Sequence, residues 1–509
     1  MRMRMVEMLV AVTALALGGC ATTPGDVAPG ETCEFEFPFM NDYDVINRTT
    51  FAWDDSYVTN SPTTYRQELA GPLCALAAST YGFRLFTDIR SLMDMGFPPE
   101  RVRRCYGKDL GYDDPRYGRD RVGYTLAVRH SELPGSDYEI VMVLVRGTFG
   151  RDEWISNVNL ANKWGEKPDP DPAAMPRFHE GFSLAADSVM DALAEFVGEQ
   201  GIDLSKAKIL VTGHSRGAAV ANLIGARLDL AGTGKGAFAA VRPENVYVYT
   251  FATPGVTIQP TEGMKDPKFG NIFNVINPED IVPTVPFAFW GAGRFGHDLH
   301  LRSCNFLPFT GTWSHPGYVG MKNAFREICG YDYYHLIGGV MAREKIGGFA
   351  RNIVPTVRSF YSVPPAMRAE GKRVCTQTFL EMVFWNRMAS ADDAARRVSL
   401  MSDMSSIASA YGDITNQRVE GTEPKRLDHR LRFIRRQSDG NGQFDPDGRD
   451  FSRQPGMGDV IWQLSCTHSF LTYLAWMKAA EAHGPSSVFY NWDDEADVPH
   501  NDWWLDNIF

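Results

Sequence analysis

The residues best suited to chemistry lie in the pentapeptide Gly213-His-Ser-Arg-Gly217. A short apolar run of strand character, 209–211, precedes it, and an apolar stretch of helical composition follows it. In this context a Gly-x-Ser-x-Gly sequence indicates a sharp, strained turn that projects the serine hydroxyl into a cleft. Without the flanking strand and helix, the pentapeptide would equally fit an ordinary Gly-rich turn. With them, it predicts that Ser215 is a nucleophile.

A serine hydroxyl is a weak nucleophile at neutral pH, so other groups must lie beside it. A base has to take its proton, a carboxylate has to orient that base, and N–H donors have to stabilise the developing negative charge. The helix predicted after Ser215 would direct its N-terminal N–H groups and the positive end of its dipole at that charge. The elements that carry these groups must therefore converge on Ser215.

Strands and helical segments alternate along the chain around this pentapeptide. The alternation predicts a mainly parallel sheet with helices on both faces. In such sheets ligands bind beyond the carboxyl ends of the strands, and Thr148, Ser215 and Asp280 each fall just past such an end. The predicted strands are 122–129, 138–145, 209–211, 246–251, 271–276 and 295–301, and the predicted helices are 72–81, one that opens at 178–182 and runs to about 199, and 218–224.

Six short motifs occur in an order and at spacings that resemble the lipase class 3 family, the fungal-type triacylglycerol lipases. The resemblance covers roughly residues 120–300 and a short C-terminal piece. It implies an α/β-hydrolase fold and ester hydrolysis by a Ser-Asp-His triad through an acyl-enzyme, with no cofactor and no metal ion. The motifs are Arg146-Gly-Thr148, Glu153-Trp-Ile155 with Asn157 and Asn159, His179-x-Gly181-Phe182, Gly213-His-Ser-Arg-Gly217, Thr250-Phe-Ala-Thr-Pro254 and Asp280-Ile-Val-Pro283.

The resemblance implies a role for each matching residue. Ser215 would be the nucleophile, and Asp280 would orient the base, with the adjacent Glu279 as the alternative carboxylate. The backbone N–H groups of Thr148 and Arg216 would bind the oxyanion. Threonine at position 148 differs from the serine of some members but keeps both the hydroxyl and the N–H.

The base would be a histidine that follows Asp280 in the chain. We favour His468, because it immediately precedes the apolar stretch 470–476, as in bacterial members of the family. His315, in a His-Pro-Gly-Tyr sequence like that of some fungal members, and His335 remain alternatives. His297 and His300 flank a predicted strand and follow Asp280 too closely.

The amphipathic stretch 150–160 occupies the position of the family's lid. Its apolar residues, Trp154 and Ile155 among them, could cover the serine and open at a lipid surface, where the exposed apolar area would be buried again. A helix fixed on the sheet is the alternative.

Residues 1–19 have the pattern of an export signal, with two arginines followed by an apolar run too short to span a bilayer. The sequence Leu17-Gly-Gly-Cys20 resembles the bacterial lipoprotein box, which implies that Cys20 becomes the N-terminus and is lipidated, with palmitate as a typical acyl group. We therefore expect a membrane-anchored protein of the bacterial cell envelope, on the outer membrane and facing the periplasm or the surface. An ordinary signal peptide with an incidental cysteine is the alternative.

The predicted domain plan is a signal peptide, 1–19; a tether, 20–45; the hydrolase core, 46–302; a large insertion before the catalytic histidine and candidate cap, 303–455; the C-terminal part of the core, 456–490; and an acidic, aromatic tail, 491–509. The insertion follows from the choice of His468, because it separates that histidine from Asp280 in the chain. A cap would supply substrate selectivity and exclude water. A peripheral embellishment is the alternative.

Composition excludes other classes of function. The formal net charge of −11, without a basic patch, argues against nucleic acid as a partner and against attraction to anionic lipid. Seven cysteines besides Cys20 cannot all pair with one another, so at least one thiol stays free, and the absence of a Cys-x-x-Cys pair argues against zinc. The segment 439–450 resembles a calcium loop but lacks its central glycine, which favours a solvated turn.

The predicted function is that of a serine ester hydrolase, a lipase or carboxylesterase acting on acyl-glycerols or related esters. A phospholipase A-type hydrolase would use the same triad on a different ester. A non-catalytic envelope lipoprotein that uses the fold for binding is the alternative from a different class. The sequence leaves the acyl chain and the oligomeric state open.

Overall fold

The structure is a computed structural model of the 509-residue chain. It describes residues 30–39, 42–106, 122–149, 177–231, 236–259, 262–277, 280, 282–284, 293–302, 315–329 and 468–489. Cys20, the lid residues Trp154 and Ile155, Glu279, His335, the calcium-like segment and the acidic tail lie outside these ranges. None of the described helices is both long enough and apolar enough to cross a membrane.

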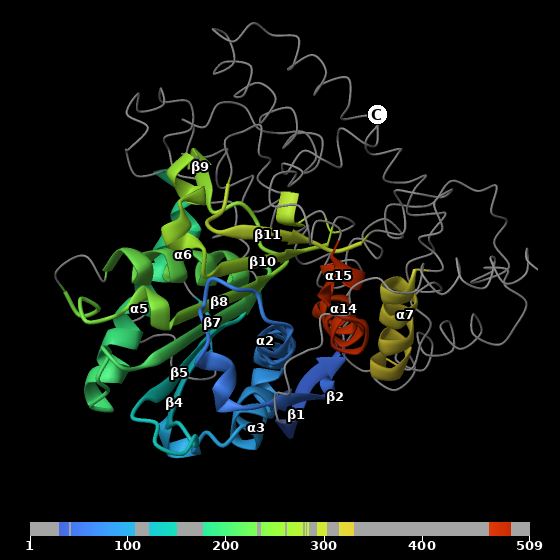
Figure 1. The fold of residues 1–509 in the computed structure, drawn as a ribbon, viewed down its shortest axis with the longest axis horizontal. Helices are drawn as coiled ribbons and strands as arrows, with labels where there is room; N and C mark the ends of the chain where they lie inside the picture. Colours follow the sequence, from blue (N-terminus) through green and yellow to red (C-terminus); the bar gives the residue numbers. More distant parts are fainter. Residues whose placement is uncertain are drawn as a thin grey trace, which may run out of the picture.

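A seven-stranded sheet forms the centre of the described structure, in the order β11-β10-β8-β7-β5-β4-β3 (Figure 1). The five strands from β11 to β5 run parallel, and β4 and β3 are added antiparallel at one edge. The strands are β3 (Val102–Cys105), β4 (Tyr124–His130), β5 (Glu139–Val145), β7 (Lys208–His214), β8 (Val246–Phe251), β10 (Ile272–Ile276) and β11 (His297–His300).

Helices cover both faces of the sheet. On one face lie α5 (Glu180–Glu199) and α6 (Arg216–Ala231); on the other lie α2 (Gln67–Ser79), α14 (Phe470–His483) and α7 (Pro316–Cys329) (Figure 1). This is the α/β-hydrolase arrangement that the sequence predicts. The remaining elements are β1 (Glu31–Phe39), β2 (Asp42–Trp53), α3 (Thr87–Asp94), β6 (Arg177–Phe178), β9 (Thr257–Gln259), α15 (Pro485–Val488) and short 3₁₀ turns.

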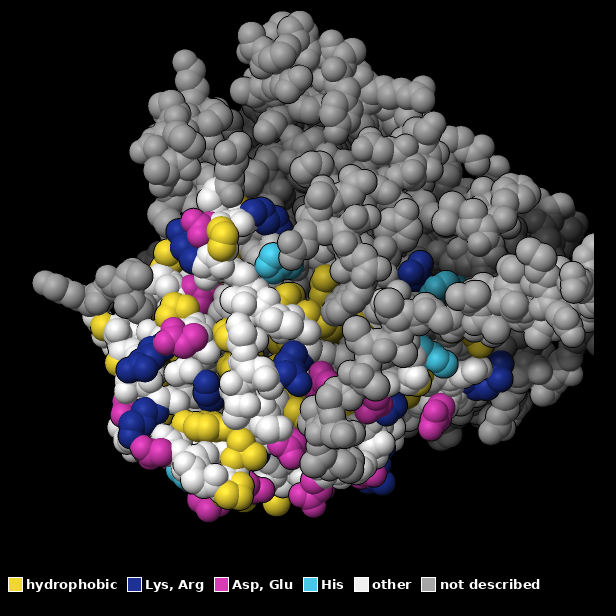
Figure 2. Space-filling view, in the orientation of Figure 1, with side chains coloured by type: hydrophobic (Ala, Val, Ile, Leu, Met, Phe, Trp, Pro, Cys, Tyr) yellow, Lys and Arg dark blue, Asp and Glu magenta, His cyan; other side chains and the backbone are white. Residues whose placement is uncertain are grey.

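The strands are apolar on both sides because both sides are buried. Along β5, Ile140, Met142 and Leu144 belong to the core under α2, whereas Val141 and Val143 belong to the core under α5 and α6. Because successive side chains of a strand point to opposite faces of the sheet, one strand contributes residues to two separate cores. Figure 2 shows that the surface in view carries basic and acidic side chains intermixed, which agrees with the absence of a basic patch in the sequence.

The predicted elements agree with the structure in type and approximate position. The helix predicted at 72–81 begins earlier, at Gln67, because α2 accommodates Pro72 in its interior. A proline there removes one backbone hydrogen bond, and burial of residues such as Leu69 and Leu73 on the sheet compensates for it.

The tether predicted at 20–45 is wrong over its second half. Residues Glu31–Phe39 form β1, which pairs with β2 in an antiparallel hairpin. Phe35 and Phe37 are fully buried, and the ring centroid of Phe37 lies 6.3 Å from that of Phe470 in α14. Alternating phenylalanines give this strand an apolar face that packs on the core, so the segment is a buried strand and not a tether.

Part of the predicted insertion packs into the core. Within 303–455, α7 lies against α14, and a Cβ at Gly320 would come within 2.5 Å of the His483 ring. The centroids of Tyr318 and Trp476 are 6.2 Å apart. This helix therefore supports the one that follows His468. The other residues of that stretch, apart from 315, lie outside the described ranges.

Asp229, in the last turns of α6, is a buried carboxyl group that forms no ion pair with the described residues. Its Oδ1 accepts from Asn271 Nδ2 at 2.9 Å, and its Oδ2 has no hydrogen-bond partner there. Burial raises the pKa of Asp229 to about 7. The folded chain therefore holds a proton that an unfolded aspartate, with a pKa near 3.9, has already lost.

Ionisation of Asp229 consequently destabilises the folded state, beginning above about pH 4 and reaching its full extent above about pH 7. We expect Asp229→Asn, which cannot ionise, to raise the free energy of unfolding by about 2–4 kcal/mol more at pH 8 than at pH 4. Urea denaturation at the two pH values measures the difference. The exposed Asp191 provides the matched control, Asp191→Asn. An equal change for Asp229→Asn at both pH values would contradict the burial argument.

Candidate active site

Ser215 occupies the turn between β7 and α6 in a conformation that L-residues rarely adopt, with φ +61°. A left-handed conformation costs about 1–2 kcal/mol for such a residue, so the surrounding backbone must hold it. The Ser215 N–H donates to the Phe251 carbonyl at 2.9 Å, and its own carbonyl accepts from Ala218 N at 2.9 Å. The turn is therefore anchored to β8 on one side and to the helix on the other.

The two glycines of the pentapeptide are required by close backbone contacts. A Cβ at Gly213 would lie 2.4 Å from the Gly217 carbonyl oxygen, and a Cβ at Gly217 would lie 2.2 Å from the Val145 carbonyl oxygen. Neither contact could be relieved by a side-chain rotation, because the atoms belong to the backbone. A side chain at either position would therefore collide with the neighbouring backbone, which explains why both ends of the pentapeptide are glycine.

The structure brings together Ser215, His468 and Asp280. His468 Nε2 lies 2.8 Å from Ser215 Oγ, and His468 Nδ1 lies 2.8 Å from Asp280 Oδ2. The three come from the end of β7, the residues before α14 and the loop after β10. Ser215 is 8% exposed and Asp280 is 1% exposed, so both are buried and the carboxylate is almost completely shielded from water.

The other histidines that the sequence offers have different surroundings. His315 precedes α7, where its Nδ1 accepts from the Gly317 N–H at 3.3 Å within its own turn. His297 and His300 are the first and last residues of β11. Among the described histidines, the one hydrogen-bonded to Ser215 is therefore His468.

The carboxylate of Asp280 has three donors. Its Oδ1 accepts from Val282 N at 2.9 Å, and its Oδ2 accepts from the Tyr473 hydroxyl at 2.8 Å as well as facing His468 Nδ1. Burial, and then the charge of Asp280, raise the pKa of Tyr473 well above its ordinary value, so the phenol stays protonated and donates. No motif in the sequence points to Tyr473. The usable signal is its place on the helix that His468 precedes.

The two segments proposed to bind an oxyanion lie against each other. Arg216 opens α6, and Thr148 follows the end of β5. Between them, a Cβ at Gly147 would meet the Tyr81 hydroxyl at 1.8 Å and the His214 carbonyl oxygen at 2.8 Å. Gly147 thus lets the backbone after β5 approach the turn that carries Ser215.

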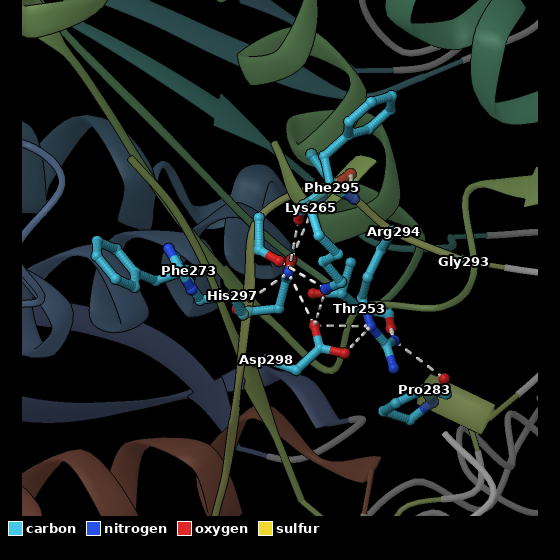
Figure 3. Close-up of polar contacts among 12 residues, drawn as sticks. Thr253, Lys265, Phe273, Pro283, Gly293, Arg294, Phe295, His297 and Asp298 are labelled. Carbon is cyan, nitrogen blue, oxygen red and sulfur yellow. Dashed lines mark hydrogen bonds and ion pairs between the residues drawn. The ribbon is translucent and has the colours of Figure 1, made fainter. Parts of the chain in front are cut away.

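A buried arginine holds the loop that carries Asp280. Arg294, 2% exposed, donates from Nε to the Asp298 carboxylate at 3.0 Å, and from Nη1 to the Pro283 carbonyl at 3.0 Å and to the Thr253 carbonyl (Figure 3). Burial alone would raise the pKa of Asp298, but the charges of Arg294 and then Lys265 lower it to about 2. The ion pair therefore joins the loops after β8 and β10 to β11.

The described residues contain no group of three or more His, Cys, Asp or Glu placed to hold a metal ion. Cys33 and Cys74 are buried, and burial raises the pKa of the Cys33 thiol to about 11, which keeps it protonated and unreactive. A hydroxyl, an imidazole and a carboxylate converge around Ser215. Acyl transfer requires a nucleophile, a base and a carboxylate that orients the base, and this arrangement suits those requirements.

Comparison with known proteins places the similarity over the same region. The family model described as Lipase (class 3) matches residues 142–290, which include Ser215 and Asp280 but not His468. A lipase from Rhizomucor miehei is 25% identical over 215 residues, covering 37% of this chain and 54% of the relative. The chain therefore spans about half the length of this curated relative.

Two solved structures illustrate the structural likeness. One is a triacylglycerol lipase in which a serine protease triad forms the catalytic centre, at 19% identity and TM-score 0.34, covering 47% of this chain and 82% of that one. The other is lipase II from Rhizopus niveus, at 18% identity and TM-score 0.32, covering 47% of this chain and 80% of that one.

Proposed function

We propose that this protein, similar over its hydrolase core to class 3 lipases, is a serine ester hydrolase that acts on acyl-glycerols or related carboxylic esters. The observation that carries the proposal is the chain of two 2.8 Å contacts from Asp280 through His468 to Ser215. A nucleophile on a strained turn, a base within hydrogen-bond reach and a buried carboxylate together suit acyl transfer.

In the proposed reaction, Ser215 Oγ attacks the ester carbonyl carbon while His468 Nε2 takes the hydroxyl proton. The resulting oxyanion is bound by the N–H groups of Thr148 and Arg216, each such donor lowering the barrier by about 2.7–4 kcal/mol. The tetrahedral intermediate collapses, the C–O bond breaks, and the imidazolium returns its proton to the leaving alcohol. Asp280 stabilises the imidazolium throughout.

Water completes the cycle by the same route. His468 removes a proton from a water molecule, the hydroxide attacks the acyl-enzyme, and Ser215 leaves with the proton that the imidazole gives back. Tyr473 keeps Asp280 oriented during both halves, because its hydroxyl donates to the carboxylate oxygen that faces His468. The acyl chain is set by the shape of the pocket, and a phospholipase A-type reaction would use the same steps on a phospholipid ester.

Covalent capture tests the proposal. A p-nitrophenyl alkylphosphonate should react with the wild-type protein by losing p-nitrophenol, leaving a phosphonyl group on Ser215 that mass spectrometry of the digested protein locates. The same preparation should hydrolyse p-nitrophenyl butyrate with a burst of p-nitrophenol if deacylation is slow. No adduct and no turnover would instead support the non-catalytic envelope lipoprotein.

We further propose that the chain is exported and lipidated on Cys20, on the basis of the Leu-Gly-Gly-Cys sequence and the apolar run before it. Acyl groups such as palmitate would hold the protein in the bacterial cell envelope, since each buried CH₂ contributes about 0.8 kcal/mol. The same digest tests this, because the N-terminal peptide should begin with an acylated Cys20. A peptide containing unmodified Cys20 within a longer N-terminus would contradict it.

A further inference from the structure

His214 joins the turn that carries Ser215 to the main chain of His468. Its Nε2 lies 2.9 Å from the His468 carbonyl oxygen, and its Nδ1 lies 2.8 Å from the Tyr81 hydroxyl. The side chain is 3% exposed. One imidazole thus bridges three segments that are far apart in the sequence: the 3₁₀ turn after α2, β7 and the residues before α14.

The chemistry of these partners fixes where the hydrogen atoms lie. A carbonyl oxygen can only accept, so His214 Nε2 must carry a hydrogen and donate. Burial, and then the nearby His468, lower the pKa of His214 well below its ordinary value, so the ring is neutral and has one N–H. Its Nδ1 must therefore accept from the Tyr81 hydroxyl, and the tautomer is determined on both sides.

The hydrogen bond from His214 constrains the main chain of His468, whereas the contact with Asp280 constrains its ring. Asp280 binds the imidazole at Nδ1 and so sets the rotation of the ring. His214 binds the main-chain carbonyl and so sets the position of the backbone from which the ring projects. Because His214 is bonded directly to Ser215 in the chain, the backbone of the base is tied to the backbone of the nucleophile through a single side chain.

The surrounding aromatic rings support the link. The Tyr81 ring stacks on Phe470, two positions after His468, at a centroid distance of 5.0 Å. The His214 ring packs edge-on to Tyr473, the residue that also donates to Asp280, at 5.6 Å. Movement of the His214 ring is therefore restricted by side chains on the same helix that His468 precedes.

We propose that His214 is a positioning residue for the base: by donating from Nε2 to the His468 carbonyl, it holds His468 Nε2 at hydrogen-bond distance from Ser215 Oγ. The inference rests on the proposed hydrolase function. Displacing a catalytic group by about 1 Å can cost about 100-fold in rate without changing substrate binding. The effect of losing this bond should therefore fall on kcat and leave KM nearly unchanged.

Two substitutions separate the hydrogen bond from the volume of the side chain. His214→Leu fills much of the same space without a donor, and we expect it to lower kcat for p-nitrophenyl butyrate about 10–100-fold with KM within about 2-fold. His214→Gln carries an amide N–H that can reach the His468 carbonyl, and we expect it to recover most of the lost kcat. Tyr247→Phe is the control for a lost buried hydrogen bond. Tyr247 lies near the start of β8, the end away from Ser215, and donates to the Val58 and Asn60 carbonyls.

Thermal unfolding of all three variants shows whether a loss of activity follows a loss of stability. If Tyr247→Phe lowers stability as much as His214→Leu but leaves kcat at the wild-type value, the effect of His214 is local to the site. If His214→Leu retains wild-type kcat, or if His214→Gln is as impaired as His214→Leu, the proposal is overturned.

A second measurement does not depend on turnover. Nitrogen NMR of ¹⁵N-histidine-labelled protein, with His214→Leu used to assign the signal, should show His214 as the neutral Nε2–H tautomer at pH 7. A Nδ1–H tautomer or a charged ring would overturn the proposal even in an active enzyme. The expected tautomer in a wild-type protein that neither hydrolyses esters nor reacts with the phosphonate would support the link and refute only the hydrolase function.

Discussion

Replacement of Ser215 by alanine is expected to lower kcat for p-nitrophenyl ester hydrolysis by about 10⁴–10⁶-fold. The alanine removes the only atom that forms the acyl-enzyme bond. It keeps the backbone that binds the oxyanion, so a residual rate above that of water should persist. The φ of +61° strains alanine and serine alike, since both carry a Cβ, and the fold should survive the exchange.

The control for this substitution is Ser188→Ala. Ser188 lies in α5, where its hydroxyl donates to the Leu184 carbonyl of the same helix at 3.0 Å, and its loss should leave kcat unchanged. Initial rates on p-nitrophenyl butyrate, together with loss of phosphonate labelling, measure both variants. A Ser215→Ala protein with more than about a tenth of the wild-type kcat would exclude Ser215 as the nucleophile.

The second large effect concerns the base. We expect His468→Ala to lower kcat about 10⁴–10⁶-fold, because without the imidazole no group in the described structure lies in position to take the proton from Ser215 Oγ. The variant retains its main-chain carbonyl, so its contact with His214 can persist. The loss therefore measures the side chain itself.

His315→Ala is the matched control, since the sequence offers that histidine as an alternative base. Its imidazole accepts within its own turn, from the Gly317 N–H, and its loss should change kcat by less than about 2-fold. Comparing kcat of the two variants on the same ester decides which histidine is the base. A large loss in His315→Ala with full activity in His468→Ala would reverse the assignment.

Ser215, Asp280 and His468 are distant in the sequence but meet because of where the strands end and where α14 packs. Parallel strands end at the same edge of the sheet, and Ser215, Asp280 and Thr148 all follow such ends. The histidine does not follow a strand of the sheet. His468 lies just before α14, which packs between α2 and α7. Asp280 holds its ring, and His214 holds its main-chain carbonyl.

The sequence by itself determined the features whose causes are local. The turn at Ser215 requires glycine at 213 and 217 because of contacts within a few residues and with one neighbouring strand, so a pentapeptide between strand and helix is enough to predict it. The strands β4, β5, β8 and β10 were predictable for a similar reason. Strands buried on both faces form short apolar runs bounded by turn residues.

The tertiary structure decided the features that depend on which distant surfaces meet. Several histidines follow Asp280. The apolar stretch after His468 favours that histidine by resemblance, but only the packing of α14 brings its imidazole to Ser215. The roles of Tyr473 and His214 arise only from that packing, and so does the burial of Phe35 and Phe37 in a segment expected to be a tether. Local sequence limits the backbone conformations of a segment, whereas the contacts between segments depend on the free energy of burying all their apolar faces together.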